Sequence, residues 1–151
     1  IAGQVVAWCG DGNNVARSWI EAAVRFGFTL RLATPDGLRP PADLVDWARA
    51  QGGKIELTDD PVEAVGGARC VVTDTWVSMG QEHAHNKMAA MMPYQVNERL
   101  MALAKPDAKF LHCLPAHRGD RPAAQQVRKQ MVIAIPVTVL VQRHQKDLMR
   151  Q

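Results

Sequence analysis

The chain has 151 residues, the length of one ordinary domain, and 47% of them are apolar and 22% charged. This composition excludes a disordered chain, a coiled coil and a collagen-like repeat, and no apolar run reaches the ~18 residues of a membrane helix. The net charge of +3 is unevenly spread, because residues 1–119 carry 12 basic and 13 acidic side chains and residues 120–151 carry six and two. The balanced charge of residues 1–119 therefore gives no reason to expect binding to nucleic acid.

Three cysteines, Cys9, Cys70 and Cys113, cannot all pair with one another, and their spacing matches no zinc site. They favour a reducing compartment, so we predict a cytoplasmic protein that holds no metal.

Short apolar runs alternate with helical patterns along the chain, and glycine or proline separates most of them. The predicted strands are Gln4–Cys9, Thr29–Ala33, Lys54–Leu57, Arg69–Thr73 and Lys109–Cys113. The predicted helices are Asn14–Phe26, Ala42–Gln51, a short one from Pro61 to Val65, and Pro93–Ala104. This alternation is typical of an α/β protein with three layers, a Rossmann-like parallel sheet with helices on both faces.

Ligands of such sheets bind at the carboxyl ends of the strands, which directs attention to three strand-end strings. The first is G-D-G-N-N, Gly10 to Asn14, which lacks the third glycine of the dinucleotide fingerprint. Its simpler interpretation is a tight turn in which an asparagine caps the following helix. Its functional interpretation is that Asn14 hydrogen-bonds a small polar ligand.

The second string is D-T-W-V-S-M-G, Asp74 to Gly80. An aspartate at a strand end can pair with the ammonium group of a ligand in a partly dry site. Ser78 and the backbone at Met79 could bind a carboxylate, and Gly80 permits a hinge. The simpler interpretation is an ordinary loop with Trp76 in the core.

The third string is H-C-L-P-A-H-R-G, His112 to Gly119. Cys113 at a strand end is a candidate reactive thiol, although a single cysteine is often only a small buried residue. A cis bond before Pro115 would turn the Leu114 carbonyl into the site.

Taken together, in this order and at these separations, the three strings closely resemble ornithine carbamoyltransferase, and within it the C-terminal, ornithine-binding domain. The resemblance covers about Gly3 to Gly119 and includes L-A-T-P at Leu32–Pro35 and P-Y-Q-V-N at Pro93–Asn97. The S-M-G string points to ornithine over aspartate as the acceptor.

The resemblance implies transfer of a carbamoyl group from carbamoyl phosphate to the δ-amine of L-ornithine, giving citrulline and phosphate without a metal or organic cofactor. It implies that Asn14 and the Ser78–Met79 loop hold the α-carboxylate of ornithine, and that Asp74 binds its α-ammonium. Cys113, linked to Asp74, would orient and help deprotonate the δ-amine, while the Leu114 carbonyl would accept from the carbamoyl NH₂.

Two departures from the family pattern accompany this resemblance. The S-T-R-T-R and H-P-x-Q strings of the family's N-terminal carbamoyl phosphate domain do not occur here, so we expect that domain to be absent and this chain to be inactive alone. Most contacts of the family's trimer also lie in that domain. Residues 120–151 lack the family's E-N-R string, and we expect a divergent tail packed on the domain formed by residues 1–119.

Two rival interpretations remain open at this stage. The chain could be a non-catalytic module on the same fold, serving amino-acid binding or assembly. A dinucleotide-binding oxidoreductase is disfavoured, because an acidic residue should end its second strand and Ala33-Thr34 stands there instead.

Overall fold

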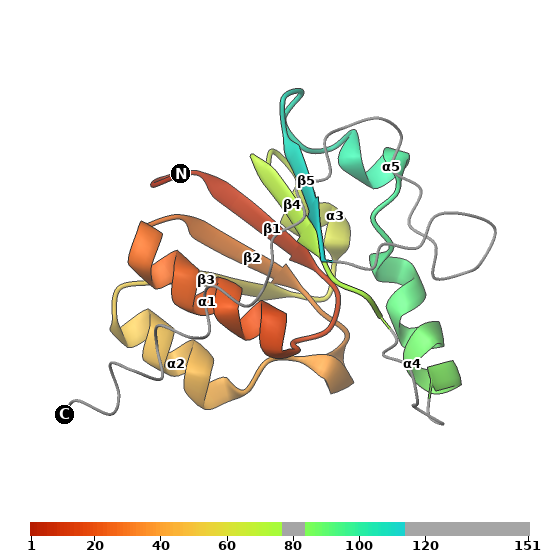
Figure 1. The fold of residues 1–151 in the computed structure, drawn as a ribbon, viewed down its shortest axis with the longest axis horizontal. Helices are drawn as coiled ribbons and strands as arrows, with labels where there is room; N and C mark the ends of the chain where they lie inside the picture. Colours follow the sequence, from red (N-terminus) through yellow and green to blue (C-terminus); the bar gives the residue numbers. More distant parts are fainter. Residues whose placement is uncertain (77–83, 114–151) are drawn as a thin grey trace.

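The computed structural model describes residues 1–76 and 84–113, and in these ranges the chain forms a five-stranded parallel sheet with helices on both faces (Figure 1). The predicted fold class is therefore confirmed. Its strands are β1 (Val5–Cys9), β2 (Thr29–Ala33), β3 (Lys54–Thr58), β4 (Cys70–Thr73) and β5 (Lys109–His112). Its helices are α1 (Asn14–Phe26), α2 (Ala42–Ala50), α3 (Pro61–Val65), α4 (Ala84–Met91) and α5 (Glu98–Met101), with 3₁₀ turns η1 (Asp36–Leu38) and η2 (Met92–Tyr94).

The order of the strands in the sheet is β3-β2-β1-β4-β5. The chain moves outward from β1 through β2 to β3, and then returns to the other side of β1 to form β4 and β5. The order therefore reverses between β1 and β4, and the loops that follow these two strands diverge there. In open α/β sheets this switch point is where a ligand has room to bind.

Alternation along each strand divides the core into two layers, one on each face of the sheet. Val6 and Trp8 of β1 point to the face covered by α1 and α2, where they join one buried cluster. Ala7 and Cys9 point to the opposite face, covered by α3 and α5, and join the other. Figure 1 shows α1 and α2 together on one side of the sheet and α4 beyond the carboxyl ends of the strands.

Polar side chains begin three of the helices. Asn13 precedes α1, and its side-chain oxygen accepts hydrogen bonds from the backbone N–H groups of Val15 and Ala16 at 2.9 and 3.0 Å. Asp60 caps α3 in the same way, with Pro61 in the first turn, and Asn97 caps α5. These caps satisfy backbone donors that a helix leaves free at its start, so the local sequence sets where each helix begins.

The predicted helix Pro93–Ala104 is wrong as one element. It is replaced by η2 and α5, because Asn97 leaves helical geometry to accept a hydrogen bond from the Leu100 backbone and so begins a new helix. Between the two segments Val96 is fully buried, and Tyr94 donates its hydroxyl hydrogen to the Asp59 carbonyl at 2.9 Å. The helix α4 was not predicted from the sequence. No helix in the described ranges is both long and apolar enough to cross a membrane.

Candidate functional site at the switch point

Asp74 and the loop after β1 meet at the switch point. Asn13 Nδ2 donates a hydrogen bond to Asp74 Oδ2 at 2.9 Å, and the Thr75 backbone N–H donates to Asp74 Oδ1 at 2.7 Å. Each carboxylate oxygen therefore has a donor, while Asp74 remains only partly buried. A carboxylate held in this way is oriented before any ligand arrives.

Asn13, and not Asn14, is the asparagine that reaches Asp74. Asn13 uses its oxygen to cap α1 and its amide nitrogen to hold Asp74, so both ends of the side chain are engaged. Asn14 is exposed as the first residue of α1. A capping asparagine in this turn was predicted from the sequence but its bond to Asp74 was not, because the only signal was its place just before the helix.

Cys113 lies directly after β5, the strand beside β4, and it is buried. Burial, the negative charge of Asp74 and a hydrogen bond to the Asp74 carboxylate, with burial the largest cause, together raise the pKa of its thiol from 9.0 to about 12. The thiol is therefore neutral near pH 7 and donates to Asp74. These surroundings are unlike those of a reactive thiolate, which needs nearby positive charge.

His112 fixes the backbone at the same strand end. Its ring nitrogen Nδ1 is hydrogen-bonded to the Cys113 carbonyl oxygen, and the ring is buried beside Phe110. On the neighbouring strand, Thr73 Oγ1 donates to the Cys9 carbonyl at 2.7 Å and ties the end of β4 to the end of β1. The strand ends that carry Asp74 and Cys113 are thus anchored by buried contacts.

Glycine allows the loop after β1 to pass close to its neighbours. A Cβ on Gly12 would lie 2.2 Å from the backbone nitrogen of Pro40, so no larger residue fits without movement of one chain segment. The Gly12 N–H donates to the Leu38 carbonyl, and Trp8 Nε1 donates to the Asp11 carbonyl at 3.0 Å. The loop that presents Asn13 is therefore held on both sides.

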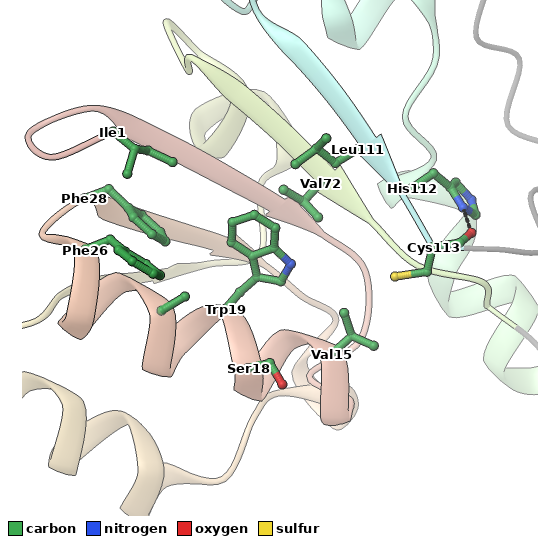
Figure 2. Close-up of a pocket in the computed structure, with 11 residues that line it drawn as sticks. Ile1, Val15, Ser18, Trp19, Phe26, Phe28, Val72, Leu111, His112 and Cys113 are labelled. Carbon is green, nitrogen blue, oxygen red and sulfur yellow. Dashed lines mark hydrogen bonds between the residues drawn. The ribbon is translucent and has the colours of Figure 1, made fainter. Parts of the chain in front are cut away.

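An apolar cavity of about 270 Å³ opens beside Cys113, between α1 and the adjoining face of β4 and β5. Figure 2 shows Trp19 and Phe26 of α1 facing Val72 and Leu111 of the strands across it, with Cys113 at one end. At the rim, Phe26 and Ile1 expose 55% and 62% of their surface. The described residues that line the cavity are mostly apolar, with Ser18 and His112 as polar exceptions, unlike the polar site around Asp74.

Of the predicted site residues, the structure brings Asp74 and Cys113 together. Ser78, Met79 and Leu114 lie outside the described residues, and their predicted roles stay predictions. Trp76, two residues after Asp74, is buried as the simpler interpretation of its loop expected.

Comparisons with known proteins identify the family of this domain. Residues 2–144 match the family model described as aspartate/ornithine carbamoyltransferase, Asp/Orn binding domain. The chain belongs to this family. The family match also extends beyond Gly119, into the part of the chain where the sequence analysis saw a divergent tail.

Individual carbamoyltransferases agree with this assignment. The chain is 57% identical over 120 residues to the ornithine carbamoyltransferase of Mesorhizobium japonicum, covering 80% of this chain and 40% of that protein. It is 60% identical over 114 residues to that of Rhizorhabdus wittichii, covering 76% and 37%. The solved ornithine carbamoyltransferase from Pyrococcus furiosus superposes with a TM-score of 0.71 at 45% identity, covering 79% of this chain and 40% of that one. The chain thus spans about two fifths of the length of these carbamoyltransferases.

Proposed function

We propose that this chain supplies the acceptor-binding part of an ornithine carbamoyltransferase. The reaction is transfer of the carbamoyl group of carbamoyl phosphate to the δ-amine of L-ornithine, with citrulline and phosphate as products. The observation that carries the proposal is the oriented Asp74 carboxylate beside Cys113, at the switch point of a domain whose relatives bear that name.

Asp74 is suited to bind the α-ammonium of ornithine, because a charge-assisted pair in a partly buried place is stronger than one in open water. Each of its oxygens already accepts from an N–H group and the Cys113 thiol donates to the same carboxylate, but a carboxylate oxygen can accept more than one hydrogen bond. By resemblance, Asn14, Ser78 and Met79 hold the α-carboxylate of the same substrate. A zwitterion would then find one fixed anion and several donors.

Cys113 is proposed to lie near the δ-amine, where it acts through its hydrogen bond with Asp74 and not as a nucleophile. The δ-amine must be neutral to attack the carbonyl carbon of carbamoyl phosphate, so its proton has to leave before or during the attack. A neutral thiol that is hydrogen-bonded to a carboxylate can orient the δ-amine and exchange a proton with the amine. The Leu114 carbonyl is proposed to accept from the carbamoyl NH₂.

Carbamoyl phosphate is proposed to bind mainly through residues that this chain does not contain. The tetrahedral intermediate and the phosphate carry negative charge, and stabilising them requires donors or cations aimed at those oxygens. The family's S-T-R-T-R string would provide such groups, and it does not occur in this sequence. We therefore propose that residues 1–119 form the acceptor domain with residues 120–151 as its extension. Activity would need the carbamoyl phosphate domain and assembly into a trimer-type homo-oligomer. The proposed location of the protein is the cytoplasm.

The test is to join this chain behind the preceding part of the Mesorhizobium japonicum relative and to measure citrulline formation. The account predicts citrulline that depends on both L-ornithine and carbamoyl phosphate. Asp74→Asn and Cys113→Ala should each lower kcat/KM at least about a hundredfold, whereas Cys70→Ala, a buried thiol away from the site, should have little effect. Ornithine binding without any citrulline would instead favour a non-catalytic amino-acid-binding module.

A further inference from the structure

Two polar contacts join the loop after β1 to residues that follow β4 in the chain. The first is the Asn13–Asp74 hydrogen bond of the candidate site. The second is an ion pair between Lys87 Nζ of α4 and Asp11 Oδ2, 2.7 Å apart. Asp74 and α4 are therefore each tied to residues 10–13, the loop that follows β1.

An apolar contact from the same helix supports the second contact. Met91 follows Lys87 by one helical turn, and residues four apart share a face of a helix. Met91 is fully buried, and its Cε lies 3.5 Å from the position that a Cβ on Gly10 would occupy. One face of α4 therefore contacts two consecutive residues of the loop, Gly10 and Asp11.

The Lys87–Asp11 pair is shielded from water. The Asp11 side chain is 11% exposed and that of Lys87 26%, whereas the carboxylates of the other ion pairs among the described residues are 57% to 81% exposed. Exposed pairs contribute little, but removing one partner of a shielded pair leaves a charge without compensation. The Lys87–Asp11 pair therefore favours the loop conformation that keeps Asp11 within reach of Lys87.

Asp11 is well placed to transmit this restraint to Asn13. Its own carbonyl accepts from Trp8 Nε1, and the next residue, Gly12, donates to Leu38. The Lys87 pair adds a further restraint, on the Asp11 side chain, to the short stretch of chain that ends at Asn13. We propose that Lys87 is a positioning residue of the acceptor site, which acts through Asp11 to keep the Asn13 amide on Asp74.

A first experiment needs no ligand and measures hydrogen–deuterium exchange at the backbone amides of Val15 and Ala16. These amides donate to Asn13 Oδ1, so they report directly on the position of the Asn13 side chain. Lys87→Met should speed their exchange about tenfold, and Lys87→Arg should restore slow exchange because it keeps the cation. Asp11→Asn breaks the same pair from the other side and should act like Lys87→Met. The matched control is Lys105→Met, which removes an exposed hydrogen bond to Gln4 far from the site.

A second experiment rests on the proposed function and measures the Kd of L-ornithine for the full chain by calorimetry. Lys87→Met should raise this Kd about tenfold, Lys87→Arg should restore it, and Lys87→Met combined with Asp11→Asn should bind no more weakly than either single variant. Unchanged amide exchange in both single variants, or failure of Lys87→Arg to restore it, would overturn the positioning role. If the unaltered chain does not bind ornithine, the proposed function fails, and the exchange experiment alone decides the role of Lys87.

Discussion

The Asn13 amide nitrogen lies 2.9 Å from Asp74 Oδ2, a contact that joins residues 61 positions apart at the point where the strand order of the sheet reverses. The same asparagine caps α1 with its oxygen, so the start of the helix and the orientation of the acidic group depend on one side chain. The residue whose sequence position marks the start of α1 is therefore also part of the candidate site.

Replacing Asn13 should separate its two roles. Asn13→Ala removes both, and loss of the cap should lower the free energy of unfolding by about 1 kcal/mol. Asn13→Ser retains a capping oxygen but not the amide that holds Asp74, so stability should return while affinity for L-ornithine stays low. Urea unfolding and calorimetric titration measure the two effects, and recovery of affinity in Asn13→Ser would contradict the role assigned to the amide.

Gly12 should tolerate no side chain. Gly12→Ala places a Cβ against the backbone of Arg39 and Pro40 and should lower the free energy of unfolding by about 1–3 kcal/mol. The control is Gly37→Ala in the same region, because a Cβ there meets no atom within 4 Å and should change stability by less than about 0.5 kcal/mol. Equal stability of the two variants would show that the loop is less tightly held than the structure indicates.

Much of the fold could be predicted from the sequence because short apolar runs end at glycine or proline. The ranges of β2, α1 and α3 agree with prediction, and those of the other strands differ by one residue at an end. The division of 93–104 into two segments depends on the tertiary burial of Val96 and Tyr94, which no local pattern reveals. The helix α4 is stabilised by contacts to the loop after β1, and its own sequence has only a weak amphipathic pattern.

Only those residues of the candidate site could be predicted that have a reactive or charged side chain at a strand end. Asp74 and Cys113 stand at strand ends, and strand ends meet at one edge of a parallel sheet. The contacts of Asn13 and Lys87 escaped prediction because each joins a partner distant in sequence. An asparagine before a helix, or a lysine on a helix, is common for ordinary structural reasons.

The thiol of Cys113 should respond to the charge of Asp74. Asp74→Asn removes the carboxylate that raises the pKa of this thiol, so the pKa should fall and alkylation by iodoacetamide at pH 9 should become faster. Mass spectrometry of the Cys113 peptide measures the rate, with the Cys70 peptide as internal reference. A slower reaction in Asp74→Asn would contradict the contact.

Buried Cys9 should make stability depend on alkaline pH. Burial raises the pKa of its thiol from 9.0 to about 12, so the folded state keeps the proton that the unfolded chain releases above pH 9. Its contribution to stability is complete below pH 9, and it falls by about 1.4 kcal/mol per pH unit as pH rises from 9 toward 12. Cys9→Ala should show a shallower decline in urea unfolding between pH 9 and 11. An identical decline in both proteins would contradict the burial of this thiol.

Binding of the amino acid by Asp74 is the central claim, and calorimetric titration of the full chain with L-ornithine tests it most directly. The account predicts measurable binding that weakens at least about tenfold in Asp74→Asn, a change that keeps the size of the side chain and removes its charge. It also predicts weaker binding of 1,4-diaminobutane, which lacks the α-carboxylate. Equal affinity of the unaltered chain and Asp74→Asn for L-ornithine would contradict the account.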